Sequence, residues 1–208
     1  MKLIKLAVLL STLVAASFAQ ASFSNASFEN NNVSGGYLYA PQVVATGWSF
    51  ANGAGVSANS TAWGGITQSG NYFAFLQNTA SISQTFNNTN AANLSFSFDL
   101  AQRSAWNNGG AQTIDVLFDN QKYASFTPKN SLGWDTWGSF SFTVNNVNAG
   151  SHTLAFIGVN PLHAGDTAAF LDNVAVNVAP VPEPETYALM GMGLVALIAA
   201  RRRKMKAA

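Results

Sequence analysis

The residues best suited to chemistry lie between positions 103 and 112, where a cation, an indole and side-chain amides follow one another. Arg103 is the only arginine between residues 22 and 180, and Trp106, Asn107 and Gln112 come shortly after it. A sugar site needs a flat apolar ring beside planar hydrogen-bonding groups, and this stretch supplies both. It predicts non-catalytic carbohydrate binding, by stacking on a loop tryptophan with hydrogen bonds from Arg103, Asn107 and Gln112.

An alternative for Arg103 is a structural ion pair with Asp99 or with Asp115. The tryptophans also divide into two groups. Trp48 alternates with Phe50 and is expected in the core. The others lie in or near loops rich in glycine and asparagine, where ligand-binding residues gather, and one of them is expected to be a ligand platform. These loop residues are Trp63, Trp106, Trp134 and Trp137.

Signals for catalysis are weak. His152 follows a turn and His163 lies near Asp166, but the sequence has neither a G-x-S-x-G elbow nor an H-E-x-x-H motif. A glycosidase would need two carboxylates on one face, for which the candidates are Asp99, Asp115 and Asp119. Because charged residues are only 9% of the chain, we expect no enzyme and keep a glycan hydrolase as the least favoured alternative.

Charge and cysteine content narrow the function classes further. The formal net charge is +1, but most basic residues lie in the two terminal segments, and the middle of the chain is mildly acidic. That distribution argues against nucleic-acid binding, which needs a basic patch. The absence of cysteine excludes disulfides, thiol nucleophiles and cysteine metal sites. The remaining neutral, polar surface suits uncharged sugars or a matrix polymer.

Short alternating segments must position these residues. Leu94, Phe96, Phe98 and Leu100 alternate with polar residues, which is typical of a half-buried strand. Similar segments with turn signals between them predict an all-β fold, an antiparallel β-sandwich or jelly roll. Strands are expected within 43–50, 71–77, 80–86, 94–100, 113–118, 122–126, 139–144, 152–159 and 168–178, after a short strand or an extended start at 22–29.

The last predicted strand places a carboxylate where an apolar side chain is expected. Phe170, Asp172 and Val174 share one parity, so Asp172 falls on the apolar face unless a bulge intervenes. A buried carboxylate needs a partner. Backbone N–H groups, a basic side chain and a cation all remain open as that partner.

Both ends of the chain have the composition of processed segments. Residues 1–21 form a secretory signal peptide with a signal helix, ending in the A-x-A pattern at residues 19–21, and cleavage is expected after Ala21 or else after Ala19. Residues 22–179 form the β-sandwich domain, and 180–186 a proline-rich linker. Residues 187–200 are expected to form a short hydrophobic transmembrane helix, followed by a basic tail at 201–208.

This C-terminal segment resembles the PEP-CTERM sorting signal of Gram-negative bacteria. The resemblance is carried by a Pro-Glu-Pro motif, an apolar helix and an arginine cluster. The residues are Pro182, Glu183, Pro184, Arg201, Arg202 and Arg203. It implies recognition by an exosortase and the export machinery, with transient inner-membrane association through the helix. The implied destination is the cell surface or extracellular matrix.

A second resemblance covers the middle of the chain. The segment Asn25–Glu29, the pair Gly47-Trp48 and the segment Phe170–Val174 are similar to galactose-binding-like jelly rolls, a fold that many carbohydrate-binding modules share. It implies that Glu29 and Asp172 help to hold a structural calcium ion, which needs six to eight oxygen ligands.

A recurring pattern in exported PEP-CTERM proteins is also similar to parts of this chain. Those parts are Ala101-Gln102-Arg103, Gln112, Gly150-Ser151-His152 and Phe156-Ile157-Gly158. The sequence as a whole favours an exported protein that binds extracellular polysaccharide. The alternative is a structural matrix or biofilm protein that self-associates through exposed strand edges.

Overall fold

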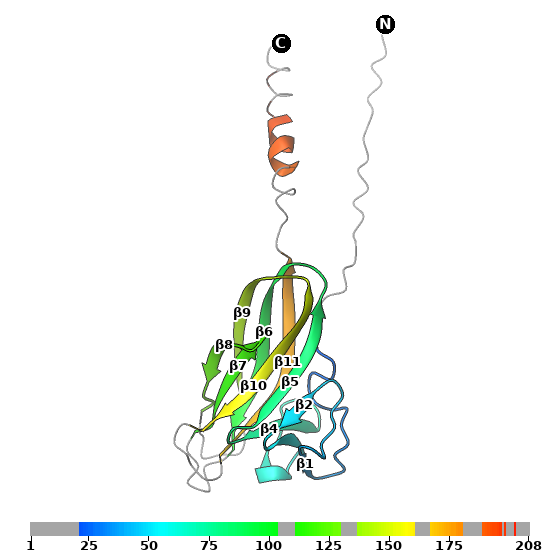
Figure 1. Cartoon of the computed structure of the whole chain (residues 1–208), viewed down its shortest axis with the longest axis vertical. Helices are drawn as coiled ribbons and strands as arrows, with labels where there is room; N and C mark the ends of the chain where they lie inside the picture. The colour runs from blue at the N-terminus through cyan, green and yellow to red at the C-terminus, as the bar shows by residue number, and fades with distance from the viewer. Residues whose placement is uncertain are drawn as a thin grey trace.

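The computed structural model describes residues 21–103, 111–129, 137–160, 167–180, 189–196, 198 and 202. In this part of the chain eleven antiparallel strands form two sheets (Figure 1). The six-stranded sheet has the order β1 (Tyr37–Tyr39), β3 (Ala54–Ala58), β4 (Tyr72–Gln77), β11 (Ala168–Pro180), β6 (Ala92–Gln102), β9 (Gly138–Val147). The five-stranded sheet has the order β2 (Ser49–Ala51), β5 (Ser81–Asn88), β10 (Gly150–Val159), β7 (Thr113–Phe118), β8 (Gln121–Phe126). The predicted antiparallel β-sandwich is therefore confirmed.

The main core lies between the two sheets, where the alternating segments meet. Phe96 and Phe98 of β6 are buried there, while Ser97 between them is exposed. Val116 of β7 and Phe156 of β10 face them from the other sheet. The period-two pattern thus predicts the inward face correctly, because each strand buries only one side.

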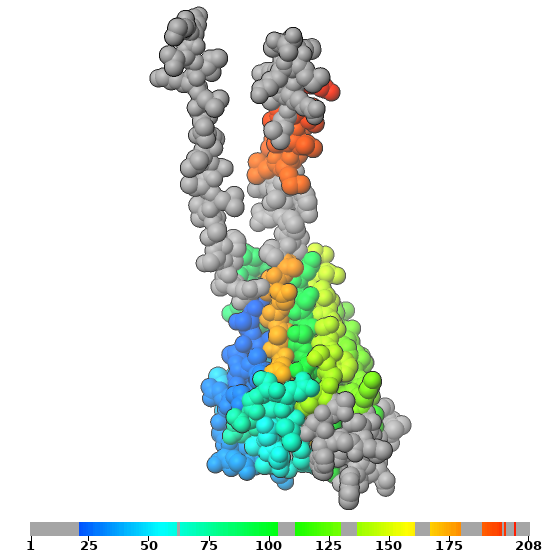
Figure 2. Space-filling model, turned by 180° about the vertical axis from the view of Figure 1, so that it is seen from behind, coloured from blue at the N-terminus to red at the C-terminus, as the bar shows by residue number. Residues whose placement is uncertain are grey.

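A second apolar cluster covers part of the outer face of the six-stranded sheet. Its buried members are Phe73, Phe75, Ala101, Trp137 and Phe170. It explains why β4 is buried on both faces, since one row of its side chains enters the main core and the other enters this cluster. Figure 2 shows the face concerned, with β11 as an orange stripe and the cyan segment that precedes β4 lying over its lower part.

The N-terminal segment packs onto the sandwich without forming a strand. Phe28 is fully buried, and Phe23 contacts Trp48 and Phe86. The buried Trp48 donates its indole N–H to the carbonyl of Asn25 at 2.9 Å, which confirms its expected place in the core. Residues 24–28 instead form a turn, in which the N–H of Phe28 binds the carbonyl of Asn25 at 3.0 Å and both residues have positive φ, so this part of the expected start is not extended.

Two segments differ from their predicted assignment. The region 43–50 contributes only to the short strand β2, and residues 52–65, where no strand is predicted, contain β3. A short 3-10 turn, η1 (Ala62–Gly64), follows β3. The signal helix lies outside the described residues.

The C-terminal segment is helical at residues 189–196, 198 and 202, which agrees with the predicted hydrophobic helix. Its apolar side chains are exposed; Leu189 and Met190, for instance, are 65% and 71% exposed. Among the described residues, no helix has both the length and the apolar character needed to cross a membrane. The transmembrane helix expected for 187–200 stays a prediction, because this segment is described only in part.

The two ends of the sandwich differ. Ala21 and Pro180, where the described domain begins and ends, lie at one end (Figure 1). β1, β2 and the turn η1 lie at the other end (Figure 1). Arg103 also lies there, because its N–H binds the carbonyl of Ala168 at the start of β11. The chain thus enters and leaves the domain far from Arg103.

Candidate functional site

Arg103 and Trp63 meet on the outer face of the six-stranded sheet. The guanidinium carbon of Arg103 lies over the indole ring, 5.1 Å from its centroid. Tyr37 of β1 lies next to the same indole, with centroids 6.0 Å apart and planes at 28°, and is 50% exposed. A partly buried indole, an exposed phenol ring and a guanidinium therefore form one surface, here called the Tyr37–Trp63–Arg103 platform.

The loop that follows β3 positions Trp63 in this platform. Asn59 accepts a hydrogen bond from the N–H of Thr67 at 2.9 Å and donates to the carbonyl of Gly70 at 3.1 Å. Ser60 donates its N–H to the carbonyl of Gly65 at 2.7 Å. The closed loop holds Trp63 at φ 52° and ψ 21°, a left-handed conformation that is rare for a bulky side chain. Such strain persists only where neighbouring contacts maintain it, and it concentrates at functional sites.

Buried rings support the platform from below. Trp63 stacks on Phe170 with centroids 6.1 Å apart and planes at 23°, and meets Phe75 edge-on at 5.0 Å. Tyr39 also meets Phe75 edge-on, and its hydroxyl donates to the side chain of Gln77 at 2.9 Å. The indole is therefore fixed before any ligand arrives.

The two carboxylates considered as partners of Arg103 are engaged elsewhere. Asp115 forms a 2.9 Å ion pair with Lys122. Asp99 accepts hydrogen bonds from Ser139 at 2.6 Å and from Asn173 at 2.8 Å. The guanidinium of Arg103 does contact the ring of Trp63.

Gln112 differs from its predicted role. The side chain of Gln112 is fully buried. Its NH2 group donates to the carbonyl of Asn78 at 2.7 Å, and its oxygen accepts from the hydroxyl of Thr167 at 2.5 Å. It therefore holds strand ends together and does not present its amide to a ligand from solvent. Trp106 and Asn107 lie outside the described residues, so their predicted contacts stay predictions.

Two parts of the pattern that resembles exported PEP-CTERM proteins lie beside this buried amide, whereas Gly150-Ser151-His152 begins β10 at its other end. Gln102 donates to the carbonyl of Gln112 at 2.7 Å and accepts its N–H at 3.1 Å. A Cβ at Gly158 would lie 2.3 Å from the carbonyl oxygen of Asn78, so the close approach requires glycine. Hydrogen bonds therefore connect the strand ends at the end of the sandwich that carries Arg103. The residues involved are Gln102, Gln112 and Gly158.

Trp137 lies in the second apolar cluster, 9% exposed, and its indole N–H donates to the carbonyl of Ile66 at 2.7 Å. Beside it is a hollow of about 170 Å³ lined by Lys129, Trp137, Gly138 and Phe140. Most of the indole faces inward, so Trp137 supports this end of the molecule. Trp134 lies outside the described residues.

Asp172 lies on the outer face of the six-stranded sheet, not in the main core. It pairs directly with Asp99, and the register shifts between Asp172 and Ala175, with Asn173 at φ 52°. This bulge breaks the assumed alternation, so Leu171 and Val174 enter the core instead. The expectation that Asp172 shares the apolar face of Val174 is wrong for this reason.

Asp172 and Glu29 both bind the segment at residues 67–72. Asp172 accepts hydrogen bonds from the hydroxyl of Thr67 and from the N–H of Asn173. Glu29 accepts the N–H groups of Asn71 and Tyr72 at 2.9–3.0 Å. Both predicted calcium ligands therefore brace the 67–72 segment, which continues the loop of Trp63.

The described side chains do not complete a calcium site. Calcium needs six to eight oxygens, whereas these two carboxylates already accept protein donors. Among the described residues, no group of three or more histidine or acidic side chains is arranged to hold a metal ion. The pKa of Asp172 is raised to about 7, mainly by burial; the hydrogen bonds of Thr67 and Asn173 oppose this rise, and the charges of Glu29 and Asp99 add to it. The calcium ion implied by the resemblance stays a prediction.

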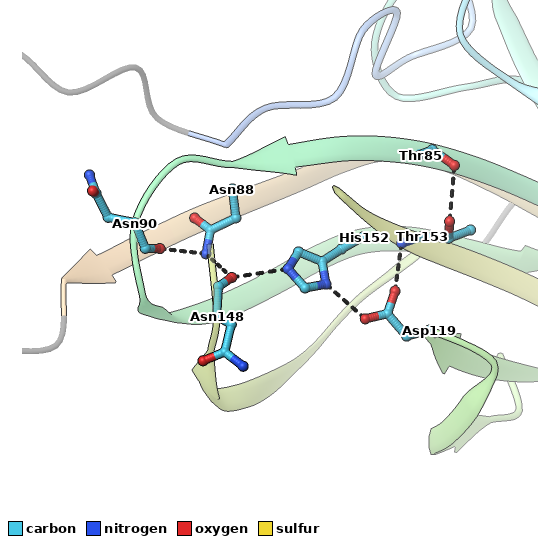
Figure 3. A network of polar contacts seen from close by, with 7 residues as sticks. All are labelled: Thr85, Asn88, Asn90, Asp119, Asn148, His152 and Thr153. Atoms are coloured by element: carbon cyan, nitrogen blue, oxygen red, sulfur yellow. Dashed lines mark hydrogen bonds and ion pairs between the residues drawn. The ribbon is translucent and has the colours of Figure 1, made fainter. Parts of the chain in front are cut away.

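His152 belongs to a polar network that joins strand ends (Figure 3). Its Nδ1 lies 2.7 Å from Asp119 and its Nε2 lies 3.0 Å from the carbonyl oxygen of Asn148. Asp119 also accepts the N–H of Thr153 at 2.9 Å. Because both ring nitrogens already have protein partners, the network is structural.

The carboxylates considered for a glycosidase do not share a face. Asp99 lies on β6 of the six-stranded sheet and Asp115 on β7 of the five-stranded sheet. Each alternates with core residues of its own strand and therefore faces outward on an opposite side of the sandwich. Asp119 lies in the β7–β8 turn and binds His152.

The C-terminal segment matches a known family model. Residues 180–204 match the PEP-CTERM protein-sorting motif. The chain carries this sorting signal. The motif indicates export and sorting to the cell surface of a Gram-negative bacterium, as the sequence predicts. Its residues Pro182, Glu183, Pro184, Arg201 and Arg203 lie outside the described part, and Arg202 is helical.

Comparison with solved structures identifies the fold of the domain. A cyclase from Fischerella sp. TAU superposes with a TM-score of 0.55 at 16% identity, covering 79% of this chain and 100% of the cyclase. The carbohydrate-binding module TmCBM61, solved with β-1,4-galactotriose, superposes with a TM-score of 0.50 at 11% identity, covering 75% and 97%. No curated protein matches this chain. Similarity at this level shows a shared jelly-roll fold alone.

Proposed function

We propose that this protein is an exported, non-catalytic binder of extracellular polysaccharide. The observation that carries the proposal is the Tyr37–Trp63–Arg103 platform, in which a guanidinium lies 5.1 Å from an indole centroid beside a half-exposed tyrosine. Sugar rings stack on flat aromatic side chains, and a guanidinium donates planar hydrogen bonds to their hydroxyl groups.

Two further features support this role. The strained backbone of Trp63 is maintained by a closed loop and by buried rings, so the platform needs little reordering on binding. The platform also lies at the end of the sandwich away from Pro180, after which the sorting motif follows. A domain held at its C-terminus would present this end to its surroundings.

The fold adds a consistent precedent, because TmCBM61 was solved with a galactotriose. In this proposal the exposed ring of Tyr37 stacks on a sugar, and Arg103 and polar loop groups bind its hydroxyls. Mature protein would be sorted by the exosortase system and would associate with the inner membrane only transiently.

A binding screen tests the proposal. The exported protein would be incubated with the insoluble and soluble polysaccharides of the producing cells and with a glycan array. Retention that Arg103→Gln weakens would support the proposal. Absence of binding to every polymer, or binding that Arg103→Gln leaves unchanged, would refute it.

A further inference from the structure

The sandwich has four edge strands among the described residues, and one of them is built differently. β1 and β2 each have three residues, too short to recruit another strand. β8 has six residues and carries Lys122. β9 has ten residues with neither a charge nor a proline. Natural proteins shorten or charge exposed edges to prevent strand pairing, and β9 lacks both protections.

The geometry of β9 is also regular over most of its length. It pairs with β6 without a register shift from Gly138 to Val144. It forms the border of the outer face shown in Figure 2, where it is the yellow-green stripe beside β6. Among the described residues, no strand pairs with the edge of β9 that faces away from β6. The backbone N–H and C=O groups of every second residue of β9 therefore point outward from the sheet.

Apolar side chains flank this unpaired edge. Phe140 and Phe142 of β9 are only half-buried, although they point toward the core. Tyr123 of β8 is 42% exposed, and its ring lies 6.2 Å from that of Phe142. The edge therefore combines free backbone groups with apolar surface, which together favour pairing with another strand.

We propose that β9 pairs antiparallel with β9 of a second copy of this chain. With a two-fold axis at Phe142, Ser141 lies opposite Thr143 of the second copy and Phe140 lies opposite Val144. Hydroxyl side chains then meet hydroxyls on the outer face, and apolar side chains meet on the inner face. Because the strand has no charge, the symmetric pairing places no like charges opposite each other. Two six-stranded sheets would join into one continuous sheet.

The pairing leaves the proposed polysaccharide platform free. β1, which carries Tyr37, and β9 are the opposite edges of the same sheet. A dimer would therefore display two platforms and gain avidity for a long polymer, a consequence that rests on the proposed function. The pairing itself does not depend on polysaccharide.

Disulfide trapping gives a direct test, since the chain has no cysteine of its own. Directly opposite Cβ atoms are about 5 Å apart, whereas diagonal neighbours are about 7–8 Å apart. Exported Ser141→Cys protein mixed with Thr143→Cys protein should form the mixed disulfide faster than either protein forms its own. A Thr85→Cys variant, exposed on the other sheet, should not cross-link. Absence of a preference for the mixed pair would overturn this register.

Sedimentation without polysaccharide tests the association itself. The exported protein should dimerise, and Ser141→Lys should weaken the dimer by at least about tenfold. Thr85→Lys should leave it unchanged, and both variants should keep the far-UV circular dichroism of the original. A protein that is monomeric at high concentration would overturn the proposal. So would a dimer that Ser141→Lys leaves intact, which would indicate another interface or a different partner for β9.

Discussion

The guanidinium of Arg103 lies 5.1 Å from the centroid of the indole of Trp63, although 39 positions separate these residues in the sequence. Trp63 reaches this place because a loop closed by Asn59 holds its backbone in a left-handed conformation. Arg103 reaches it because β6 ends beside β11, where its N–H binds the carbonyl of Ala168 at 3.0 Å. The contact between Arg103 and Trp63 therefore depends both on the loop conformation at Trp63 and on the place where β6 ends.

The loop conformation depends on a glycine that faces the second apolar cluster. A Cβ at Gly65 would lie 2.4 Å from the ring of Phe73 and 3.0 Å from that of Phe170. We expect Gly65→Ala to destabilise the fold by about 1–3 kcal/mol, because the rings must move, and to displace Trp63. Urea unfolding followed by tryptophan fluorescence would measure both effects. Gly36→Ala is the matched control, since a Cβ there meets nothing within 4 Å, and an equal loss in both variants would contradict this explanation.

Asp172 should make stability depend on pH. Burial raises its pKa from the ordinary value of 3.8 to about 7. The unfolded carboxyl loses its proton near pH 4 while the folded one keeps it, so this stabilising contribution is complete below pH 3.8 and is lost as the pH rises through 7. The full loss is on the order of 4 kcal/mol as an upper limit.

Asp172→Asn should remove this pH dependence, because the amide does not titrate; its oxygen still accepts the N–H of Asn173, and its NH2 group replaces an acceptor of the Thr67 hydroxyl by a donor to it. Urea unfolding in chelator between pH 4 and pH 8 would measure it. Titration of Asp172 is ruled out as the cause if the stability of the original protein rises with pH over this range and Asp172→Asn shows the same slope.

Calcium binding by Glu29 and Asp172 can be tested through the melting temperature. If Glu29 and Asp172 hold calcium, a chelator should lower the melting temperature of the exported protein, and Glu29→Gln should abolish that response. An identical melting temperature with and without chelator would count against the ion implied by the resemblance.

The Asp119–His152 network should contribute modestly to stability. Asp119→Asn keeps a residue that tolerates the left-handed backbone at φ 49°, but it weakens the bonds to His152 and to the N–H of Thr153. We expect a loss of about 1 kcal/mol, since the aspartate is partly exposed. The control Asp115→Asn removes a surface ion pair with Lys122 and should cost less, about 0.5 kcal/mol. The reverse order would show that the network is not structural.

Local patterns predicted the sandwich because each strand of the main core buries a single face. The alternation at Phe96 and Phe98 is visible in the sequence, and so is the place of Trp48. The second cluster was not predicted, since Phe73 and Phe170 are buried by a loop whose position depends on tertiary contacts. The bulge at Asn173 reversed the expected face of Asp172.

The candidate site was predicted in part. The sequence singled out Arg103 and included Trp63 among four loop tryptophans, but spacing alone could not show that they meet. Gln112 was misassigned because its burial depends on Asn78 and Thr167, which approach it only in the folded domain. Tyr37 was missed, and a signal for it existed only in the aromatic pair it forms with Tyr39 on a short edge strand.

The most direct test of the central claim compares two exposed tyrosines in binding to extracellular polysaccharide. Tyr37 is 50% exposed on the platform, and Tyr123 is 42% exposed on β8 in the other sheet. Affinity electrophoresis in the polymer, with Ser141→Lys present in every protein so that the β9 pairing beside Tyr123 does not contribute, should show Tyr37→Ala weakened about tenfold, a change of about 1.4 kcal/mol, with Tyr123→Ala unchanged. Equal retardation of Tyr37→Ala and the original protein, or no retardation of the original, would contradict the account.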